Sequence, residues 1–187
     1  MALLPLNRES LEAAIQRGER FAYLCFWGHQ KRADGRLAET CFSQWYPAAF
    51  VLDGQRYASA EHYMMAEKAR LFGDQAALAR ILHASTPGAA KSLGRKVRDF
   101  DEQRWNDQRF DVVVAGNLAK FSQDDDLRAF LLATGRRILV EASPVDRIWG
   151  IGLSRDDARA ERPEAWRGQN LLGFALMEVR QELVARC

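Results

Sequence analysis

The stretch that decides the fold is Tyr57-Ala58-Ser59-Ala60-Glu61-His62-Tyr63-Met64-Met65-Ala66-Glu67-Lys68-Ala69-Arg70-Leu71-Phe72. Ser59 is a favourable N-cap, because its hydroxyl can accept a hydrogen bond from a first-turn N–H that has no partner within the helix. The apolar residues that follow recur at helical spacing, which predicts a helix beginning after Ser59. Glu61 and Lys68 are two turns apart on the apolar stripe that this helix should bury.

Two interpretations of this stripe stay open at the level of local spacing. Glu61 and Lys68 could form a structural ion pair, or the amine could reach water along its apolar stem. Alternatively, they belong to a cleft that holds an acid/base carboxylate and an amine of altered pKa. Glu67 and Arg70 lie on another side of the helix and are predicted to form a solvated pair.

The composition indicates a globular domain with an ordinary surface. The chain has 187 residues, of which 48% are apolar and 28% charged, with a formal charge of +2. This length is sufficient for one domain with a full core. Such a small net charge argues against a general nucleic-acid or membrane surface, so an anion site would have to be a local basic cluster.

Compartment signals favour a cytoplasmic protein without a membrane partner. No apolar run approaches the roughly 20 residues that span a bilayer, and the first residues lack the basic region of a signal peptide. The three cysteines, Cys25, Cys41 and Cys187, show no CxxC spacing. We therefore expect reduced thiols rather than a disulfide framework or a zinc knuckle.

The order of periodic segments predicts one α+β domain, mostly helical, with a small β-sheet. The dipeptide Asp53-Gly54 between two short apolar runs predicts a hairpin with a type I′ turn. Strands are expected at 21–27, 50–52, 55–57 and 138–142, and helices at 8–17, 59–72, 74–83, 88–97, from 101 to about 121, from about 124, and at 170–184.

Standard catalytic motifs are absent from the sequence, and the three histidines are too scattered for a metal site. What remains are polar and aromatic residues in loops after apolar strands, where a rigid scaffold commonly carries a site. Asp146 and Trp149 follow the predicted strand 138–142. In the structural alternative, Trp149 packs over the sheet and Asp146 pairs with Arg147. Trp27 is a further candidate ring for stacking on a base.

Several motifs taken together resemble the NADAR superfamily, the YbiA-like N-glycosidases, over about residues 20–185. In chain order they are Phe26-Trp27-Gly28-His29, Ser43-Gln44-Trp45-Tyr46-Pro47, Asp53-Gly54, Ser59-Ala60-Glu61-His62-Tyr63 with Lys68, Gly94-Arg95, Asp146-Arg147-Ile148-Trp149-Gly150-Ile151-Gly152 and Asn170-Leu171-Leu172-Gly173. The resemblance implies a single YbiA-like α+β domain at residues 20–187, preceded by an N-terminal helical extension at residues 1–19. The loop 30–39 is longer than in compact bacterial members, which could alter the base that is accepted.

The resemblance also implies a hydrolase that cleaves the N-glycosidic bond between a ribose 5-phosphate or ADP-ribose moiety and a nitrogen base. Early riboflavin-biosynthesis intermediates and ADP-ribosylated guanine are the implied substrates, with ADP-ribosylated nucleic acid as a further partner. The alternative is a non-catalytic module that binds ADP-ribose or a nucleotide. Neither a metal nor another cofactor is implied.

The residues at the family's site positions fall into two groups. The resemblance implies that Glu61, Lys68 and Asp146 are catalytic, with Lys68 at the position of a lysine proposed to attack the sugar. The implied substrate-binding residues are Trp27, Gly28, Arg95, Trp149, Gly150 and Asn170. Arg95 stands in a basic cluster, which is usually a solvated face. Because it follows a helix that begins with a proline, its guanidinium could equally reach a phosphate.

Overall fold

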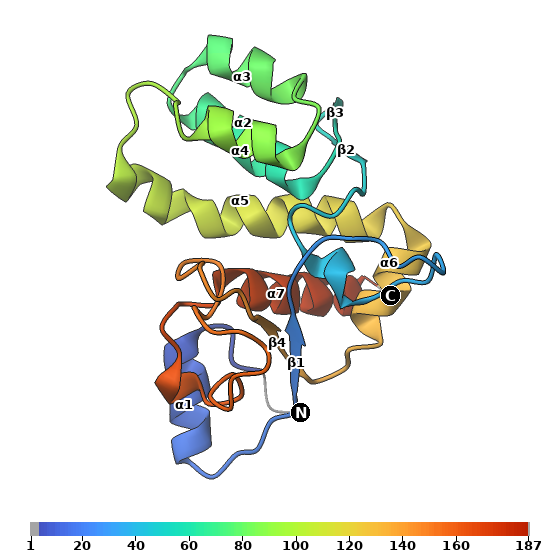
Figure 1. Cartoon of the computed structure of the whole chain (residues 1–187), viewed down its shortest axis with the longest axis vertical. Coiled ribbons are helices and arrows are strands. Elements are labelled where there is room, and N and C mark those ends of the chain that lie inside the picture. The colour runs from blue at the N-terminus through green and yellow to red at the C-terminus, as the bar shows by residue number, and fades with distance from the viewer. Residues whose placement is uncertain (1–3, 187) are drawn as a thin grey trace. The chain divides into compact units, whose positions relative to one another are not determined.

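The computed structural model describes residues 4–186, which form two compact units. Unit 1 combines the chain up to Ser43 with the chain from Asp126 onward, and unit 2 is the uninterrupted segment Gln44–Asp125. Figure 1 labels the elements of both units. None of the described helices is long and apolar enough to cross a membrane. Among the described residues, neither Cys25 nor Cys41 forms a disulfide, and Cys187 lies outside this range.

Unit 2 begins with the predicted hairpin. Strand β2 (Phe50–Leu52) pairs antiparallel with β3 (Gln55–Tyr57). The turn residues Asp53 and Gly54 have φ angles of 50° and 75°, the left-handed conformation that a type I′ turn requires at both positions. The rings of Phe50, Tyr57 and Tyr63 contact one another and join the hairpin to the helix that follows.

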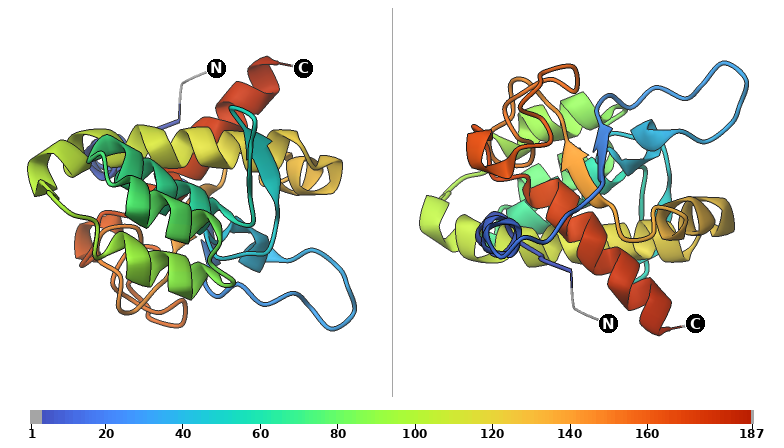
Figure 2. Two further views of the ribbon diagram at one scale, coloured as in Figure 1. Left: turned by 90° about the horizontal axis from the view of Figure 1, so that it is seen from above. Right: turned by 90° about the horizontal axis from the view of Figure 1, so that it is seen from below.

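Four helices make up the rest of unit 2, with α2 (Ala60–Leu71) at their centre. It contacts α3 (Gln75–Leu82), α4 (Pro87–Gly94) and α5 (Glu102–Ser122), as the left view of Figure 2 shows. A Cβ atom at Gly94 would collide with Met65, and one at Gly116 would collide with Tyr63. Glycine on α4 and α5 therefore allows both helices to approach α2 closely.

Each of these helices begins at a side-chain cap. The caps of α2, α3, α4 and α5 are Ser59, Asp74, Thr86 and Asp101, and each side chain accepts a hydrogen bond from a first-turn N–H. The helix predicted at 88–97 ends at Gly94 instead. Its continuation turns away, because the Arg98 N–H and guanidinium both donate to the buried Asp74 carboxylate.

Unit 1 is built on a two-stranded parallel sheet. Strand β1 (Tyr23–Phe26) pairs with β4 (Ile138–Glu141), with Phe26 opposite Glu141. Helix α7 (Leu171–Ala185) packs on β4, as the right view of Figure 2 shows. Further elements are helix α6 (Asp125–Leu132) and the short 3-10 helices η1 (Glu39–Phe42) and η2 (Pro163–Ala165), and neither 3-10 helix was expected.

The strand predicted at 21–27 is shorter and less buried than expected. It spans Tyr23–Phe26, in which only Phe26 is buried, and the Trp27 side chain beyond it is 57% exposed. The apolar residues of this segment therefore differ in environment. Those of β1 lie in the strand that pairs with β4, whereas the Trp27 side chain is exposed beyond its end.

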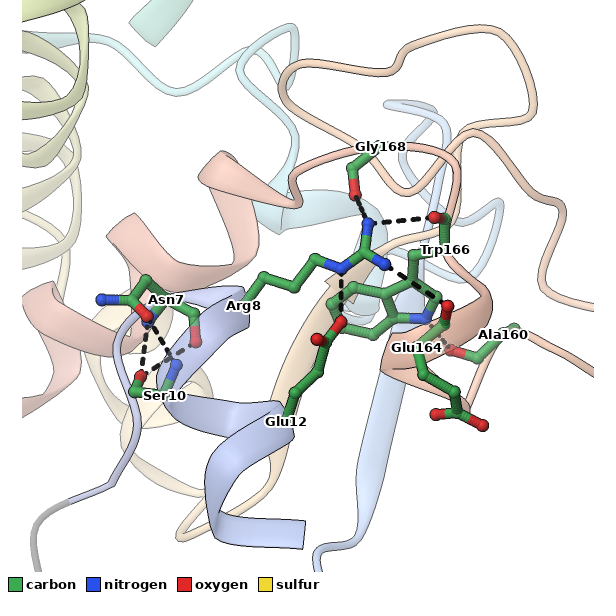
Figure 3. A network of polar contacts seen from close by, with 8 residues as sticks. All are labelled: Asn7, Arg8, Ser10, Glu12, Ala160, Glu164, Trp166 and Gly168. Carbon is green, nitrogen blue, oxygen red and sulfur yellow. Dashed lines mark hydrogen bonds and ion pairs between the residues drawn. The ribbon is translucent and has the colours of Figure 1, made fainter. Parts of the chain in front are cut away.

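Helix α1 (Arg8–Gln16) belongs to unit 1 and is tied to the segment around η2 (Figure 3). A capping box of Asn7 and Ser10 begins the helix. The guanidinium of Arg8 donates to the carbonyl oxygens of Trp166 (3.0 Å), Gly168 (3.4 Å) and Glu164 (3.4 Å), and it forms an ion pair with Glu12 at 2.7 Å. Helix α1 thus holds the backbone just ahead of α7.

Candidate active site

Glu61 lies in the first turn of α2 and is only 2% exposed. Its backbone N–H donates to the carbonyl oxygen of Gln44 at 2.9 Å. The N-terminus of a helix carries a partial positive charge that favours an ionised carboxylate. Helix α2 therefore places a buried carboxylate at the positive end of its own dipole.

Two residues that sequence reasoning missed hold this turn in place. Gln44 accepts from the Asn117 side chain through Oε1 (2.7 Å), and Asn117 also donates to the carbonyl oxygen of Val113 within α5 (2.8 Å). Both side chains are buried. Gln44 stands in a motif quoted for the family, but nothing in its local pattern indicates a link between α5 and Glu61.

His62, next to Glu61, is committed to the fold. Its Nδ1 lies 2.8 Å from Ser59 Oγ, and its Nε2 lies 3.0 Å from the carbonyl oxygen of Ala84. Burial lowers the pKa of this imidazole. His62 therefore locks the start of α2 to the segment after α3.

Lys68 is half-buried two turns after Glu61 on the same helix. Its Nζ lies 3.9 Å from the centroid of the Phe100 ring and 5.8 Å from that of Trp105. Burial, and then repulsion from Arg95, lowers the pKa of the Lys68 amine. Lys68 forms no ion pair with any described residue, so the interpretation of a structural pair with Glu61 receives no support.

Three further charged residues, Glu67, Arg70 and Arg95, lie on α2 or at the end of α4. Glu67 and Arg70 form the predicted ion pair, although both side chains are partly buried rather than fully solvated. Arg95 is exposed at the C-cap of α4, and its charge reaches Lys68. Unit 2 thus brings Lys68 and Arg95 together, with Glu61 earlier on α2.

In unit 1, candidate residues gather at the carboxyl end of the parallel sheet. Parallel strands end at one edge, where open α/β sheets commonly bind ligands. The exposed Trp27 and Gly28 (φ 85°) follow β1, and the loop from Ala142 follows β4. The Ala142 N–H donates to the Phe26 carbonyl oxygen at 2.9 Å, so the two strand ends stay in register.

Asp146 shapes the loop that carries Trp149. Its Oδ1 accepts hydrogen bonds from the N–H groups of Ile148 and Trp149, both at 2.8 Å. This is an Asx-type turn, in which a side chain replaces a backbone acceptor. No ion pair joins Asp146 to Arg147 among the described residues, so the pairing offered as the structural alternative is absent.

The loop is packed backbone to backbone against the segment that precedes α7. The carbonyl oxygens of Arg147, Gly150 and Ile151 accept from the N–H groups of Gln169, Asn170 and Arg167 at 2.9–3.1 Å. A Cβ atom at Gly168 would collide with the Gly150 carbonyl oxygen, and one at Gly150 would lie 2.8 Å from the Glu141 carbonyl oxygen. Glycine at position 150 therefore allows the loop to lie close to β4 and to the segment before α7. Its proposed contact with a substrate is a separate prediction.

Asn170 joins β4 to the start of α7. It is fully buried, with φ of 56°, and its Oδ1 accepts from the Glu141 N–H at 2.9 Å. Its Nδ2 donates to the Leu139 carbonyl oxygen at 2.9 Å. These bonds give Asn170 a structural role, and its substrate-binding role stays a prediction.

The candidate residues are thus divided between the units. Unit 1 brings together Trp27, Gly28, Asp146, Trp149, Gly150 and Asn170, whereas unit 2 holds Glu61, Lys68 and Arg95. Within each unit the residues lie on elements whose caps and hydrogen bonds are described above. Their assignment to catalysis or to substrate binding stays a prediction.

Comparison with known proteins gives one consistent family. The model of the NADAR domain matches residues 25–184. An N-glycosidase of Acanthamoeba polyphaga mimivirus is 46% identical over 165 residues, covering 86% of this chain and 95% of the relative. An N-glycosidase of Nostoc punctiforme is 34% identical over 143 residues, covering 76% and 85%.

The fold agrees with these sequence matches. The NMR structure of the E. coli protein YbiA superposes with a TM-score of 0.68 at 28% identity, covering 90% of this chain and 88% of that one. The α+β, mostly helical fold inferred from periodicity is therefore confirmed. Because the family model and these relatives each span most of its length, the chain belongs to the NADAR domain family.

Proposed function

We propose that this protein hydrolyses the bond between C1 of a ribose 5-phosphate or ADP-ribose moiety and a base nitrogen. Relatives that carry the name N-glycosidase and match most of the chain indicate an enzyme of this class. The proposal goes beyond this enzyme class in naming the substrate, a phosphorylated ribose joined to a base. It includes early riboflavin intermediates, ADP-ribosylated guanine and nucleic acid bearing that modification.

The observation that carries the proposal is the pair of functional groups on α2. Glu61 is buried at the positive end of the helix, and Lys68 has an amine whose pKa is lowered without an ion-pair partner among the described residues. Cleavage of a C–N bond at an anomeric carbon builds positive charge on the sugar. A carboxylate stabilises that charge and can take a proton from water.

The lowered pKa gives Lys68 a chemical role in the proposal. A neutral amine can attack C1 as the C1–base bond breaks, so that the base leaves with the electron pair of that bond and takes up a proton given up by the amine. The bond between C1 and the ring oxygen then opens, the ring oxygen gains a proton, and C1 forms an imine with the Lys68 nitrogen. Water then hydrolyses the resulting Lys68 imine, which frees the sugar phosphate and restores the amine. The net reaction consumes one water molecule and needs no oxidant or reductant.

Aromatic and basic side chains supply candidate contacts for the two ends of such a substrate. Trp27 is largely exposed and Trp149 half-buried, so each can offer a ring face to a base. Arg95 is exposed beside the Lys68 amine and can bind a phosphate. Asp146 is included in the proposed catalytic group, and its hydrogen bonds also hold the loop that carries Trp149.

The test is to incubate the protein separately with a pyrimidine ribosylamine 5-phosphate and with an oligonucleotide bearing ADP-ribosylated guanine, and to identify the products by mass spectrometry. We expect free base with ribose 5-phosphate from the first, or unmodified guanine with ADP-ribose from the second. Glu61→Gln should lower the rate by about 10²–10⁴.

Glu67→Gln is the matched control, because it makes the same change on the same helix at a residue paired with Arg70. It should retain nearly full activity. Failure to cleave either substrate, or equal rates for Glu61→Gln and the wild type, would contradict the proposal.

A further inference from the structure

A pocket of about 390 Å³ lies in unit 1 at the end of the sheet opposite Trp27 and Asp146. Its lining residues are Glu19, Arg20, Phe21, Ala22, Arg136 and Arg137. These residues precede β1 and β4, and the Ile138 N–H donates to the Ala22 carbonyl oxygen at 2.9 Å where the two strands begin. The pocket is therefore separate from the candidate active site within the same unit.

The charges that line this pocket are mostly positive. Arg20, Arg136 and Arg137 contribute three guanidinium groups, and Arg20 makes no hydrogen bond or ion pair with the residues that the structure describes. The carboxylate in the lining, Glu19, is already paired with Arg17 at 2.9 Å. The positive charge of the lining thus exceeds what its own carboxylate can balance.

A buried arginine adds to this positive charge. Arg180 is 3% exposed, and its guanidinium donates to neutral acceptors, Thr134 Oγ1 at 2.6 Å and the Arg137 carbonyl oxygen at 3.0 Å. Burial, followed by repulsion from Arg137 and Arg136, lowers the pKa of Arg180 to about 10. Arg136 and Arg137 therefore both repel Arg180, and an anion bound by these two lining residues would offset part of that repulsion.

One guanidinium of the lining is held in position before any ligand arrives. Arg137 donates through Nε to the Thr134 carbonyl oxygen and through Nη2 to the Ala133 carbonyl oxygen, both at 3.0 Å. These acceptors follow the end of α6, where the helix dipole favours a cation. A guanidinium has more donors than these two bonds use, so a fixed Arg137 can still bind an anion.

We propose that this pocket is a second binding site, which takes the phosphate group of a phosphorylated ligand between Arg20, Arg136 and Arg137. Planar guanidinium groups suit the oxygen geometry of phosphate better than that of a spherical anion. The volume suits a small ligand, since pockets for such molecules start at about 300 Å³. The site is independent of the reaction proposed above, and its occupation needs no turnover.

Titration with inorganic pyrophosphate, followed by site-resolved 1H–15N NMR, tests this proposal. The backbone amides of Ala22 and Arg137 should shift in a saturable way, while chloride at the same ionic strength should leave them unchanged. Because the amides near Glu61 and Lys68 are resolved separately, binding at the candidate active site is not confused with binding here.

A series of charge variants sharpens the test. Arg20→Gln should weaken binding about tenfold, which corresponds to one charge-assisted hydrogen bond. Glu19→Gln should tighten binding, because it removes the negative charge from the lining. Arg56→Gln makes the same charge change at an exposed position of unit 2 and should leave the affinity unchanged.

The source of the phosphate is distinguished by a parallel titration with a single-stranded DNA oligonucleotide. Tighter binding of the oligonucleotide with a steep salt dependence would assign the site to a phosphodiester backbone. Binding of pyrophosphate alone would assign it to a small phosphorylated ligand. No shift at Ala22 and Arg137, or equal affinity in wild type and Arg20→Gln, would overturn the proposal.

Discussion

At the scale of single residues, the neighbours Glu67 and Lys68 on α2 lie in different electrostatic environments. Glu67 precedes it directly and is neutralised by Arg70, whereas Lys68 faces the rings of Phe100 and Trp105 and the charge of Arg95. Burial and a neighbouring cation both disfavour the protonated amine. The stripe of α2 therefore carries an amine of lowered pKa, while the adjacent position carries an ion pair.

The lowered pKa of Lys68 predicts a pH-dependent contribution to stability. A folded-state pKa below the ordinary value of 10.5 means that the unfolded chain binds more protons between the two values. Relative to Lys68→Met, the wild type should therefore gain stability as the pH rises through the alkaline range toward 10.5. Urea unfolding of both proteins across this range measures the difference, and a flat difference would contradict the lowered pKa.

The proposed amine chemistry makes a separate prediction. Sodium borohydride added during turnover should reduce the imine and leave a sugar phosphate on the peptide that contains Lys68, visible by mass spectrometry. Lys68→Arg keeps the charge but cannot form this adduct, so it serves as the control. Appreciable turnover by Lys68→Met without any trapped adduct would leave attack by water, assisted by Glu61, as the mechanism.

Trp149 should contribute more to base recognition than to sugar recognition. Loss of stacking costs about 1–3 kcal/mol per base, so Trp149→Ala should weaken binding of a base-bearing substrate analogue about tenfold or more while leaving ribose 5-phosphate nearly unchanged. Calorimetric titration of both ligands gives the comparison. Equal losses for the two would mean that the ring supports the loop of Asp146 instead.

For the candidate residues, the sequence predicted the element or loop that carries each side chain better than it predicted what the side chain contacts. Glu61 and Lys68 were found from helical spacing, and Asp146 and Trp149 from their place after a strand. The structural alternative for Asp146, a pair with Arg147, is replaced by an Asx-type turn, because a carboxylate can bond nearby N–H groups as readily as a neighbouring guanidinium.

At the scale of elements, helix α1 acts on a segment far from it in the chain. Arg8 binds the carbonyl oxygens of Glu164, Trp166 and Gly168 (Figure 3), and the next residues bond the loop of Trp149. The family model begins at residue 25, beyond this helix. An element outside the matched region thus braces a loop of the candidate site.

Arg8→Ala should loosen this brace. Loss of a guanidinium that serves several carbonyl groups should lower the free energy of unfolding by about 1–2 kcal/mol, discounted for partial exposure. Hydrogen exchange at the amides of Arg167 and Gln169 should accelerate, because these amides bond the loop carbonyls. Glu12→Ala removes only the ion pair with Arg8 and is the control, and unchanged exchange in Arg8→Ala would reject the brace.

The elements themselves were largely predictable because their signals are local. Ser59, Asp101 and Asp53-Gly54 act within a few residues, so caps and turns could be read directly. Three features escaped prediction, namely the shortened β1, the two 3-10 helices and the early end of the helix at Gly94. They depend on partners distant in sequence, such as β4 for the strand and Asp74 for the chain after Gly94.

At the scale of the whole molecule, one unit is inserted into the other along the chain. Unit 2 is continuous, whereas unit 1 needs both ends of the sequence, because Tyr23 of β1 pairs with Ile138 of β4. Contacts between residues distant in sequence form slowly, since the intervening loop must first be closed. Unit 2 should therefore reach its native hydrogen bonds before unit 1.

Pulse-labelling hydrogen exchange during refolding tests this order. Amides in the middle of α2 and α5 should become protected before those of Leu24 and Val140, whose protection depends on the parallel pair. Val140→Ala removes part of a buried side chain of β4 and should slow only the later phase. Simultaneous protection of all these amides would contradict the order.

The same connectivity has a consequence during protein synthesis. When the ribosome has translated unit 2, β1 has already emerged but its only partner strand among the described elements, β4, is still to be made. At about 5–20 residues per second, the nascent chain displays an unpaired strand edge for on the order of several seconds. Such an edge is a template for pairing with other chains. A chaperone that binds nascent chains would thus find its target in Tyr23–Phe26, a segment that is paired with β4 in the finished protein.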